Sequence, residues 1–191
     1  AFSVDAKPSP LSSLLVALAT PSAQPALRAL ISQAPALASL ISALSSQSLQ
    51  ATALSGGALA AAVGRSGLFN EANLAVDRSS RASSSSKTQL AQLQKLIGEL
   101  PTTNLNTEVR ASLSTLSDLT NAALANLTHQ QLISMPQDTG SQRWCFGIPL
   151  AYEGRLVDLN MVIERDEKNG ESSNAEALWR VDLSLTLPEI G

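Results

Sequence analysis

The chain has 191 residues and a formal net charge of −3, with 44% hydrophobic, 3% aromatic and 15% charged residues. The slightly acidic charge and the lack of a Lys/Arg cluster exclude the electrostatic footprint of a nucleic-acid-binding protein. A single cysteine excludes an intramolecular disulfide, and one cysteine with one histidine cannot supply the usual ligands of a zinc site.

The first 80 residues are rich in Ala, Leu, Ser and Pro. Two similar stretches, ALRALIS at 26–32 and ALASLIS at 36–42, carry apolar residues at helical spacing between prolines. Such short helices are marginal alone and need a surface to pack against. We predict a helical, partly disordered N-terminal region over 1–80. No run approaches the roughly 18 apolar residues of a membrane span, so we expect no direct membrane insertion.

A second region, 81–136, is predicted to be a linker followed by helices. The serine-rich stretch RSSRASSSSK, 78–87, is typical of a flexible linker. The letters SKTQ at its end have the form of a capping box, which predicts a helix that stops at Pro101. A longer helix is predicted from near Asn106 to about Ile133, because its apolar residues recur at helical spacing.

Beyond Pro136 the apolar period changes from 3.6 to 2, which indicates strands. Two alternating stretches, 144–150 and 157–163, flank a short glycine-bearing turn and predict a β-hairpin. A polar loop then leads to a last strand at 178–187. The predicted fold class is α+β, with a small antiparallel β-sheet domain over 137–191.

The large side chains of the predicted sheet are interpreted as core residues. Alternating apolar residues face the interior of a protein far more often than they contact a partner. The residues interpreted in this way are Trp144, Phe146, Trp179 and Val181.

The sequence offers no convincing catalytic residue. His129 lies near a predicted helix end without an evident carboxylate or nucleophile partner, and nothing near Cys145 marks it as a reactive thiol. The glycines do not form a phosphate-binding loop. We therefore predict that the protein is not an enzyme, and that it has no catalytic, metal-binding or cofactor-binding residues and no cofactor.

Two strings resemble flagellar hook-length control proteins. The end of the chain, from Trp179 to Gly191, follows the family pattern W-x-V-x-L-x-L-x-L-P-x-(I/L)-G. Upstream, RSGLFNEANLA at 65–75 is similar to the family string S-G-L-F-Y-E-S-H-L-A, with Asn70 in place of Tyr. Together with the Trp-led hairpin and the string LTHQQLISMP, the likeness covers roughly the last two thirds of the chain.

The resemblance implies a regulator that is exported through the flagellar type III apparatus. It would be cytoplasmic at first, and its N-terminal part would act as a molecular ruler. By binding the cytoplasmic domain of the export-gate switch protein, it would switch export from hook to filament subunits. Hook and hook-cap subunits would be further partners.

The resemblance also places the partner-binding surface on the sheet. In the family more sheet follows the position of Gly191, so we expect the sheet domain to be truncated at its C-terminus, with one neighbour of the last strand missing. An unpaired edge is a template for a partner's strand. The candidate partner-binding residues are Val157, Leu159, Met161, Ile163, Val181, Leu183, Leu185 and Leu187.

Two further interpretations stay open. The helical N-terminal half is also compatible with a helix-docking module, for which the sheet would be a scaffold. A needle-length regulator of another secretion system would have the same physical requirements as a hook-length regulator. Both alternatives are non-enzymatic and act by binding.

Overall fold

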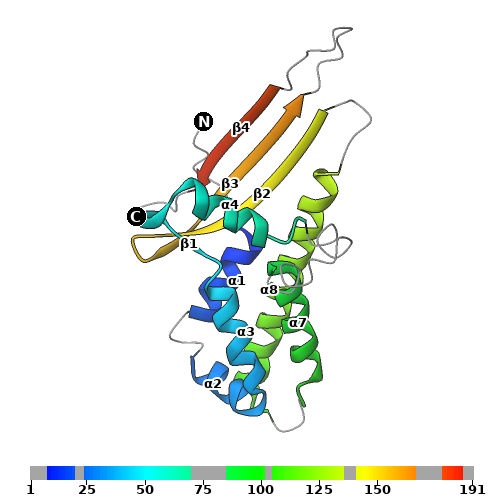
Figure 1. The fold of residues 1–191 in the computed structure, drawn as a ribbon. Helices are drawn as coiled ribbons and strands as arrows, with labels where there is room; N and C mark the ends of the chain where they lie inside the picture. Colours follow the sequence, from blue (N-terminus) through cyan, green and yellow to red (C-terminus); the bar gives the residue numbers. More distant parts are fainter. Residues whose placement is uncertain are drawn as a thin grey trace.

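The computed structural model describes residues 8–19, 24–69, 85–101, 105–135, 141–166 and 178–186. Figure 1 shows a bundle of helices at one end of the molecule and long strands that project from it. The helices are α1 (Pro10–Ala19), α2 (Gln24–Gln33), α3 (Pro35–Ser45), the short 3₁₀ helix η2 (Ala51–Ala53), α4 (Gly56–Arg65), α7 (Ser86–Glu99) and α8 (Thr107–Ile133). The strands are β1 (Leu49–Gln50), β2 (Ser141–Tyr152), β3 (Arg155–Asp166) and β4 (Leu178–Thr186). The chain therefore has the α+β fold that the sequence predicts.

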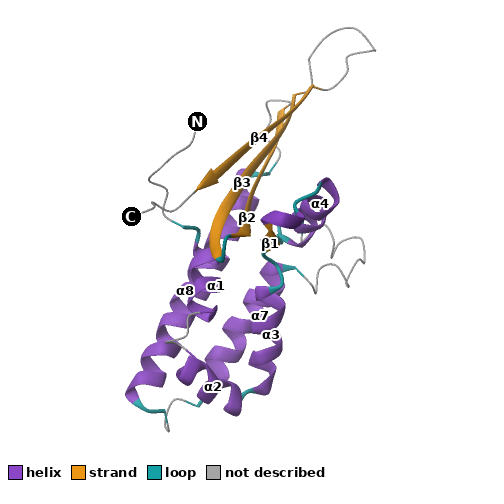
Figure 2. Cartoon of the chain, turned by 90° about the vertical axis from the view of Figure 1, so that its left-hand side faces the viewer, coloured by secondary structure: helices purple, strands orange, loops and turns teal. Residues whose placement is uncertain are grey.

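The bundle consists of α1, α2, α3, α7 and α8, which lie side by side below the sheet (Figure 2). Their apolar stripes meet in one hydrophobic cluster that is built mainly of leucine. The members with no exposed surface include Leu14, Leu30, Leu37, Leu90 and Leu93. Because isolated helices of this length are marginal in water, this shared burial is what stabilises them.

The predicted helices agree well with the observed ones. The two similar stretches near the N-terminus form α2 and α3, each with a proline at its second or first position. α8 begins after Asn106, whose side chain accepts a hydrogen bond of 2.8 Å from the backbone N–H of Val109, and ends at Ile133. The long helix thus has both predicted boundaries, with a side-chain cap at its start.

The start of α7 differs from the prediction by one residue. Its N-cap is Ser85, whose hydroxyl accepts a hydrogen bond of 3.3 Å from the backbone N–H of Thr88. Ser86, which the SKTQ pattern would make the cap, is buried inside the molecule. Its hydroxyl donates to the side chain of Gln47 and to the carbonyl of Arg65. Ser86 therefore makes tertiary contacts instead, and the preceding residue, Ser85, caps the helix.

Helices from both predicted N-terminal regions contribute to the same cluster. The leucines of α1, α2 and α3 belong to 1–80, and those of α7 and α8 belong to 81–136. The division of the chain into these regions and 137–191 stays a prediction. Residues 78–84 of the predicted linker lie outside the described residues.

The sheet has the strand order β1-β2-β3-β4. β2 and β3 form the predicted antiparallel hairpin, with Trp144 opposite Ile163, and β3 pairs antiparallel with β4, with Ile163 opposite Val181. The three predicted strands are thus antiparallel, as expected, and the sheet gains a strand that was not predicted: β1 pairs parallel to β2 through Leu49 and Leu150. β1 has only two residues, too few to show a period in the sequence.

The hairpin turn consists of Glu153 and Gly154, which both have positive φ, 48° and 74°. A two-residue turn with positive φ at both positions matches the twist of the flanking strands. Glycine adopts this conformation without strain, whereas glutamate does so less readily. The turn fixes the register in which Tyr152 lies opposite Arg155.

The two faces of the sheet have different neighbours. The apolar face, with Phe146, Ile148 and Leu159, forms a second hydrophobic cluster with α4 and β1. The opposite face meets the bundle: Asp158 accepts hydrogen bonds from the start of α1, and Gly147 lies close to Gln130 of α8. The sheet is therefore held on one face by α4 and on the other by the upper ends of α1 and α8.

Candidate partner-binding surface

β4 is the outer strand of the sheet. Among the described residues it pairs with β3 alone, so its second backbone edge faces no described strand. Three of its apolar side chains lie on the same face of the sheet as Phe146. They are Trp179, Val181 and Leu183, which are 57%, 56% and 58% exposed. We call these three residues the β4 strip.

The β4 strip is exposed because α4 is too short to cover the whole apolar face. α4 packs near β1 and β2, where it covers core residues such as Phe146. Phe146 is thus a core residue, as predicted, and Trp144 is half-buried. The interpretation of Trp179 and Val181 as core residues is wrong, since more than half of each is exposed.

The eight predicted partner-binding residues fall into different environments. Three residues of β3 lie in the core under α4: Val157, Leu159 and Met161. Ile163 and Leu185 are half-buried at the margin of that cluster. Val181 and Leu183 are exposed, and Leu187 lies outside the described residues. The accessible part of the predicted surface is therefore on β4 and not on β3.

An aromatic stack closes the outer end of the apolar face. The rings of Trp144 and Trp179 are nearly parallel, 10° apart, with centroids separated by 5.9 Å. These residues belong to β2 and β4, so the two indoles meet across β3, in which Ile163 lies opposite Trp144 and Arg165 lies opposite Trp179. The guanidinium carbon of Arg165 lies 5.7 Å from the Trp179 ring. Aromatic and arginine side chains in such arrangements dominate many binding surfaces.

The sequence reasoning missed this stack. Arg165 and Trp179 are direct partners in the register of β3 and β4. Their pairing could have been inferred only after the hairpin and the last strand had been aligned through the polar loop between them. The two tryptophans belong to strands that are not adjacent, so no local pattern joins them.

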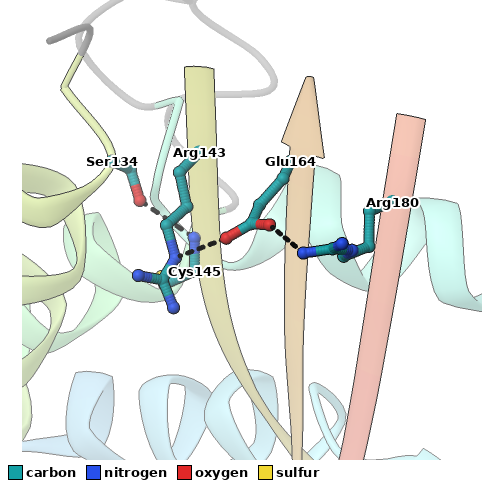
Figure 3. Close-up of polar contacts among 5 residues, drawn as sticks. All are labelled: Ser134, Arg143, Cys145, Glu164 and Arg180. Carbon is teal, nitrogen blue, oxygen red and sulfur yellow. Dashed lines mark hydrogen bonds and ion pairs between the residues drawn. The ribbon is translucent and has the colours of Figure 1, made fainter. Parts of the chain in front are cut away.

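The opposite, polar face of β4 joins an ion-pair network, shown in Figure 3. The carboxylate of Glu164 on β3 lies 3.4 Å from Arg143 Nε on β2 and 3.5 Å from an Arg180 terminal nitrogen on β4. Exposed ion pairs contribute at most about 1 kcal/mol each. They link three neighbouring strands, since the three side chains come from β2, β3 and β4.

Beside this network, the sheet is attached to the end of α8 (Figure 3). The hydroxyl of Ser134, which follows α8, accepts a hydrogen bond of 3.0 Å from the backbone N–H of Cys145. The Cys145 side chain is half-buried in β2. The role visible at this position is therefore a backbone contact that joins helix to strand.

The upstream string that resembles hook-length control proteins contacts both the helical bundle and the sheet. Gly67 has a φ of 94°, and a Cβ added there would lie 2.9 Å from the Cβ of Lys87 in α7. Its carbonyl accepts a hydrogen bond of 2.8 Å from the side chain of Gln131 in α8. Phe69 packs on Phe146 with ring centroids 6.1 Å apart. The residues of this string that are described, 65–69, therefore have a structural role.

The residues considered for chemistry were His129 and Cys145. His129 is exposed on α8, and Cys145 is half-buried on β2. Within the described ranges, no three His, Cys, Asp or Glu side chains gather as metal ligands would. Among the residues that the structure describes, no hydrogen bond pairs the Cys145 thiol with a base.

A groove of about 990 Å³ lies where α1 approaches the turn between β2 and β3. Its walls include Leu15 and Val16 of α1, and Tyr152 and Arg155 beside the turn. The residues that line it include Glu153 but neither histidine nor cysteine, and most of the lining is apolar.

Comparisons with known proteins give no match: neither a protein-family model, nor a curated protein, nor a solved structure is similar to this chain at a significant level. In the part of the chain that the structure describes, no helix has both the length and the apolar character needed to cross a membrane.

Proposed function

We propose that this protein controls flagellar hook length by binding. In this proposal it is an exported regulator that contacts the cytoplasmic domain of the export-gate switch protein and changes export from hook to filament subunits. Hook and hook-cap subunits are its further partners, and it acts without a cofactor or chemistry of its own. The proposal rests on the two strings that resemble hook-length control proteins.

The observation that best supports a binding function is the β4 strip. Trp179, Val181 and Leu183 are apolar residues of the same string that carries the resemblance, and each is more than half exposed. They lie beside a strand edge that faces no described strand. A partner that adds a strand to β4 would gain main-chain hydrogen bonds and would cover this apolar surface.

The test is complementation of a strain of the source organism that lacks the gene. We expect the deletion strain to make abnormally long hooks without filaments, and the wild-type gene to restore normal length. Leu183→Asp should fail to complement, because it places a charge on the β4 strip. Leu54→Asp is the matched control, since Leu54 is 50% exposed but lies away from β4, between η2 and α4.

Two outcomes would contradict the proposal in different ways. Hooks of normal length with normal filaments in the deletion strain would reject hook-length control altogether. Full complementation by Leu183→Asp, with the variant shown to be folded, would reject the β4 strip as the binding surface and leave the function itself standing.

The packing of the N-terminal helices supports a second candidate, a helix-docking module or needle-length regulator of another secretion system. α1, α2 and α3 join α7 and α8 in one hydrophobic cluster, as expected of a module that presents a helical surface. This candidate predicts normal hooks in the deletion strain. It also predicts a cooperative thermal unfolding transition for the helices, measured by circular dichroism.

A further inference from the structure

The edge of β4 that faces no described strand restricts the kind of strand that can pair with it. In an antiparallel pair, directly opposite residues lie on the same face of the sheet. A partner strand must therefore place apolar residues opposite the β4 strip and polar residues opposite Arg180 and Asp182. Both charged side chains are exposed on the polar face. A suitable partner carries an acidic residue opposite Arg180 and a basic residue opposite Asp182.

β4 itself, read in the opposite direction, meets these requirements in one register. If Val181 lies opposite its own copy, Arg180 lies opposite Asp182 of the partner subunit, and the partner subunit's Arg180 lies opposite Asp182. Shifting the centre to Arg180 or to Asp182 would place two like charges opposite each other. The register centred on Val181 thus forms two attractive charge pairs, each between an arginine of one copy and an aspartate of the other.

We propose that β4 pairs antiparallel with β4 of a second copy of this chain, about a two-fold axis at Val181. In this dimer, Trp179 lies opposite Leu183 of the partner subunit, so the two β4 strips form one continuous apolar surface across the joined sheets. An interface of this kind is self-complementary, as two-fold symmetry demands. The dimer pairs residues 178–184 of each strand, along the edge of β4 that no other described strand occupies.

The inference goes beyond the proposed function and does not depend on it, because the pairing requires only this chain. It uses the same strand edge as the proposed export-gate contact. Dimer and export-gate complex therefore exclude each other, because both occupy the same edge of β4 and the partner must displace one copy. Failure of the dimer would leave the hook-length experiment unaffected.

Sedimentation equilibrium of the 191-residue chain tests the dimer, with charge-reversed variants to test its register. We expect a reversible dimer for the wild type. Arg180→Asp and Asp182→Arg should each weaken it roughly tenfold or more, because each change converts two attractive pairs into two repulsive ones. An equimolar mixture of the two variants should restore a dimer, which pairs two acidic residues with two basic ones.

A disulfide cross-link tests the same register independently. In a Cys145→Ser background, which removes the free cysteine, Val181→Cys should form an intermolecular disulfide under mild oxidation. Directly opposite Cα atoms lie about 4.5–5.5 Å apart, within the range of a disulfide. Leu183→Cys is the matched control, because in this register it would lie roughly 13 Å from its own copy. This test does not disturb the Arg180–Glu164 ion pair.

Three results would overturn the inference. One is a wild-type chain that stays monomeric at a concentration on the order of 0.1 mM. Another is a dimer whose affinity neither charge reversal changes while circular dichroism shows the variants folded. The third is cross-linking of Leu183→Cys as efficiently as Val181→Cys, which would exclude the register centred on Val181.

Discussion

The hydroxyl of Ser12 in α1 donates a hydrogen bond of 2.6 Å to the carboxylate of Asp158 in β3. The backbone N–H and the hydroxyl of Ser9 donate to the same carboxylate, each at 2.6 Å. Asp158 is only 3% exposed. The start of α1 carries backbone N–H groups without intrahelical partners, so a carboxylate there is stabilised by hydrogen bonds and by the helix dipole. This contact joins the first helix to the sheet.

Replacing Asp158 with Asn should lower the free energy of unfolding by about 1–3 kcal/mol, because an amide turns a donor toward groups that donate to both carboxylate oxygens. Ser12→Ala should cost about 1 kcal/mol, since it removes one donor only. Urea denaturation followed by circular dichroism measures both. Asp118→Asn, at an exposed position of α8, is the control and should stay within about 0.5 kcal/mol. An equal loss for both aspartates would contradict the contact.

Gly67→Ala should destabilise the fold by about 1–3 kcal/mol, because the added methyl group meets Lys87 and because a φ of 94° strains any residue other than glycine. Gly64→Ala is the contrasting variant. A Cβ at Gly64 meets nothing within 4 Å, and the position lies in α4. It should raise stability by up to about 1 kcal/mol through helix propensity. Thermal unfolding of the two variants should therefore shift in opposite directions.

Leucines on the same apolar face should differ strongly in their energetic contribution. Leu159→Ala should cost about 2–5 kcal/mol, because Leu159 is buried under α4. Leu183→Ala, on the neighbouring strand, should cost less than about 1 kcal/mol, since the side chain is mostly exposed. Chemical denaturation at a low protein concentration measures the difference without a contribution from dimerisation. Similar losses at the two positions would show that β4 is covered in solution.

Glu164→Gln should lower stability by about 0.5–1 kcal/mol at low ionic strength, because it removes the charge that attracts both Arg143 and Arg180. The loss should shrink at high salt, where exposed charges are screened. Glu153→Gln, at the exposed hairpin turn, provides the control. Denaturation curves at two salt concentrations suffice. A loss of several kcal/mol that salt leaves unchanged would indicate a buried interaction instead.

The parts of the fold that were predicted correctly depend on local patterns. The apolar period of two specified the hairpin, and the cap at Asn106 with the apolar stripe specified α8. The exposure of Trp179 and Val181 could not be predicted in this way. Alternation tells which side chains share a face, whereas their burial depends on how far α4 reaches across the sheet. A helix of ten residues is too short to cover one whole face of three long strands.

The contacts that the sequence could not predict join distant segments. The residues around Ser12 do not predict a carboxylate partner in β3. Those around Leu49 do not predict a parallel partner in β2. Among the candidate binding residues, the strand membership was predictable from the period. The separation into buried β3 residues and exposed β4 residues was not, because it depends on packing between elements that are far apart in the sequence.

The contact of Ser9 with Asp158 spans 149 positions of the chain, which has a consequence for biosynthesis. α1 leaves the ribosome well before its partners in α8 and β3. The leucines of α1 therefore have no complete core to enter until those later segments have been translated. Contacts of such high sequence separation slow folding. The growing chain is thus expected to reach its final structure only after synthesis of β3, and to depend until then on being kept from association with other chains.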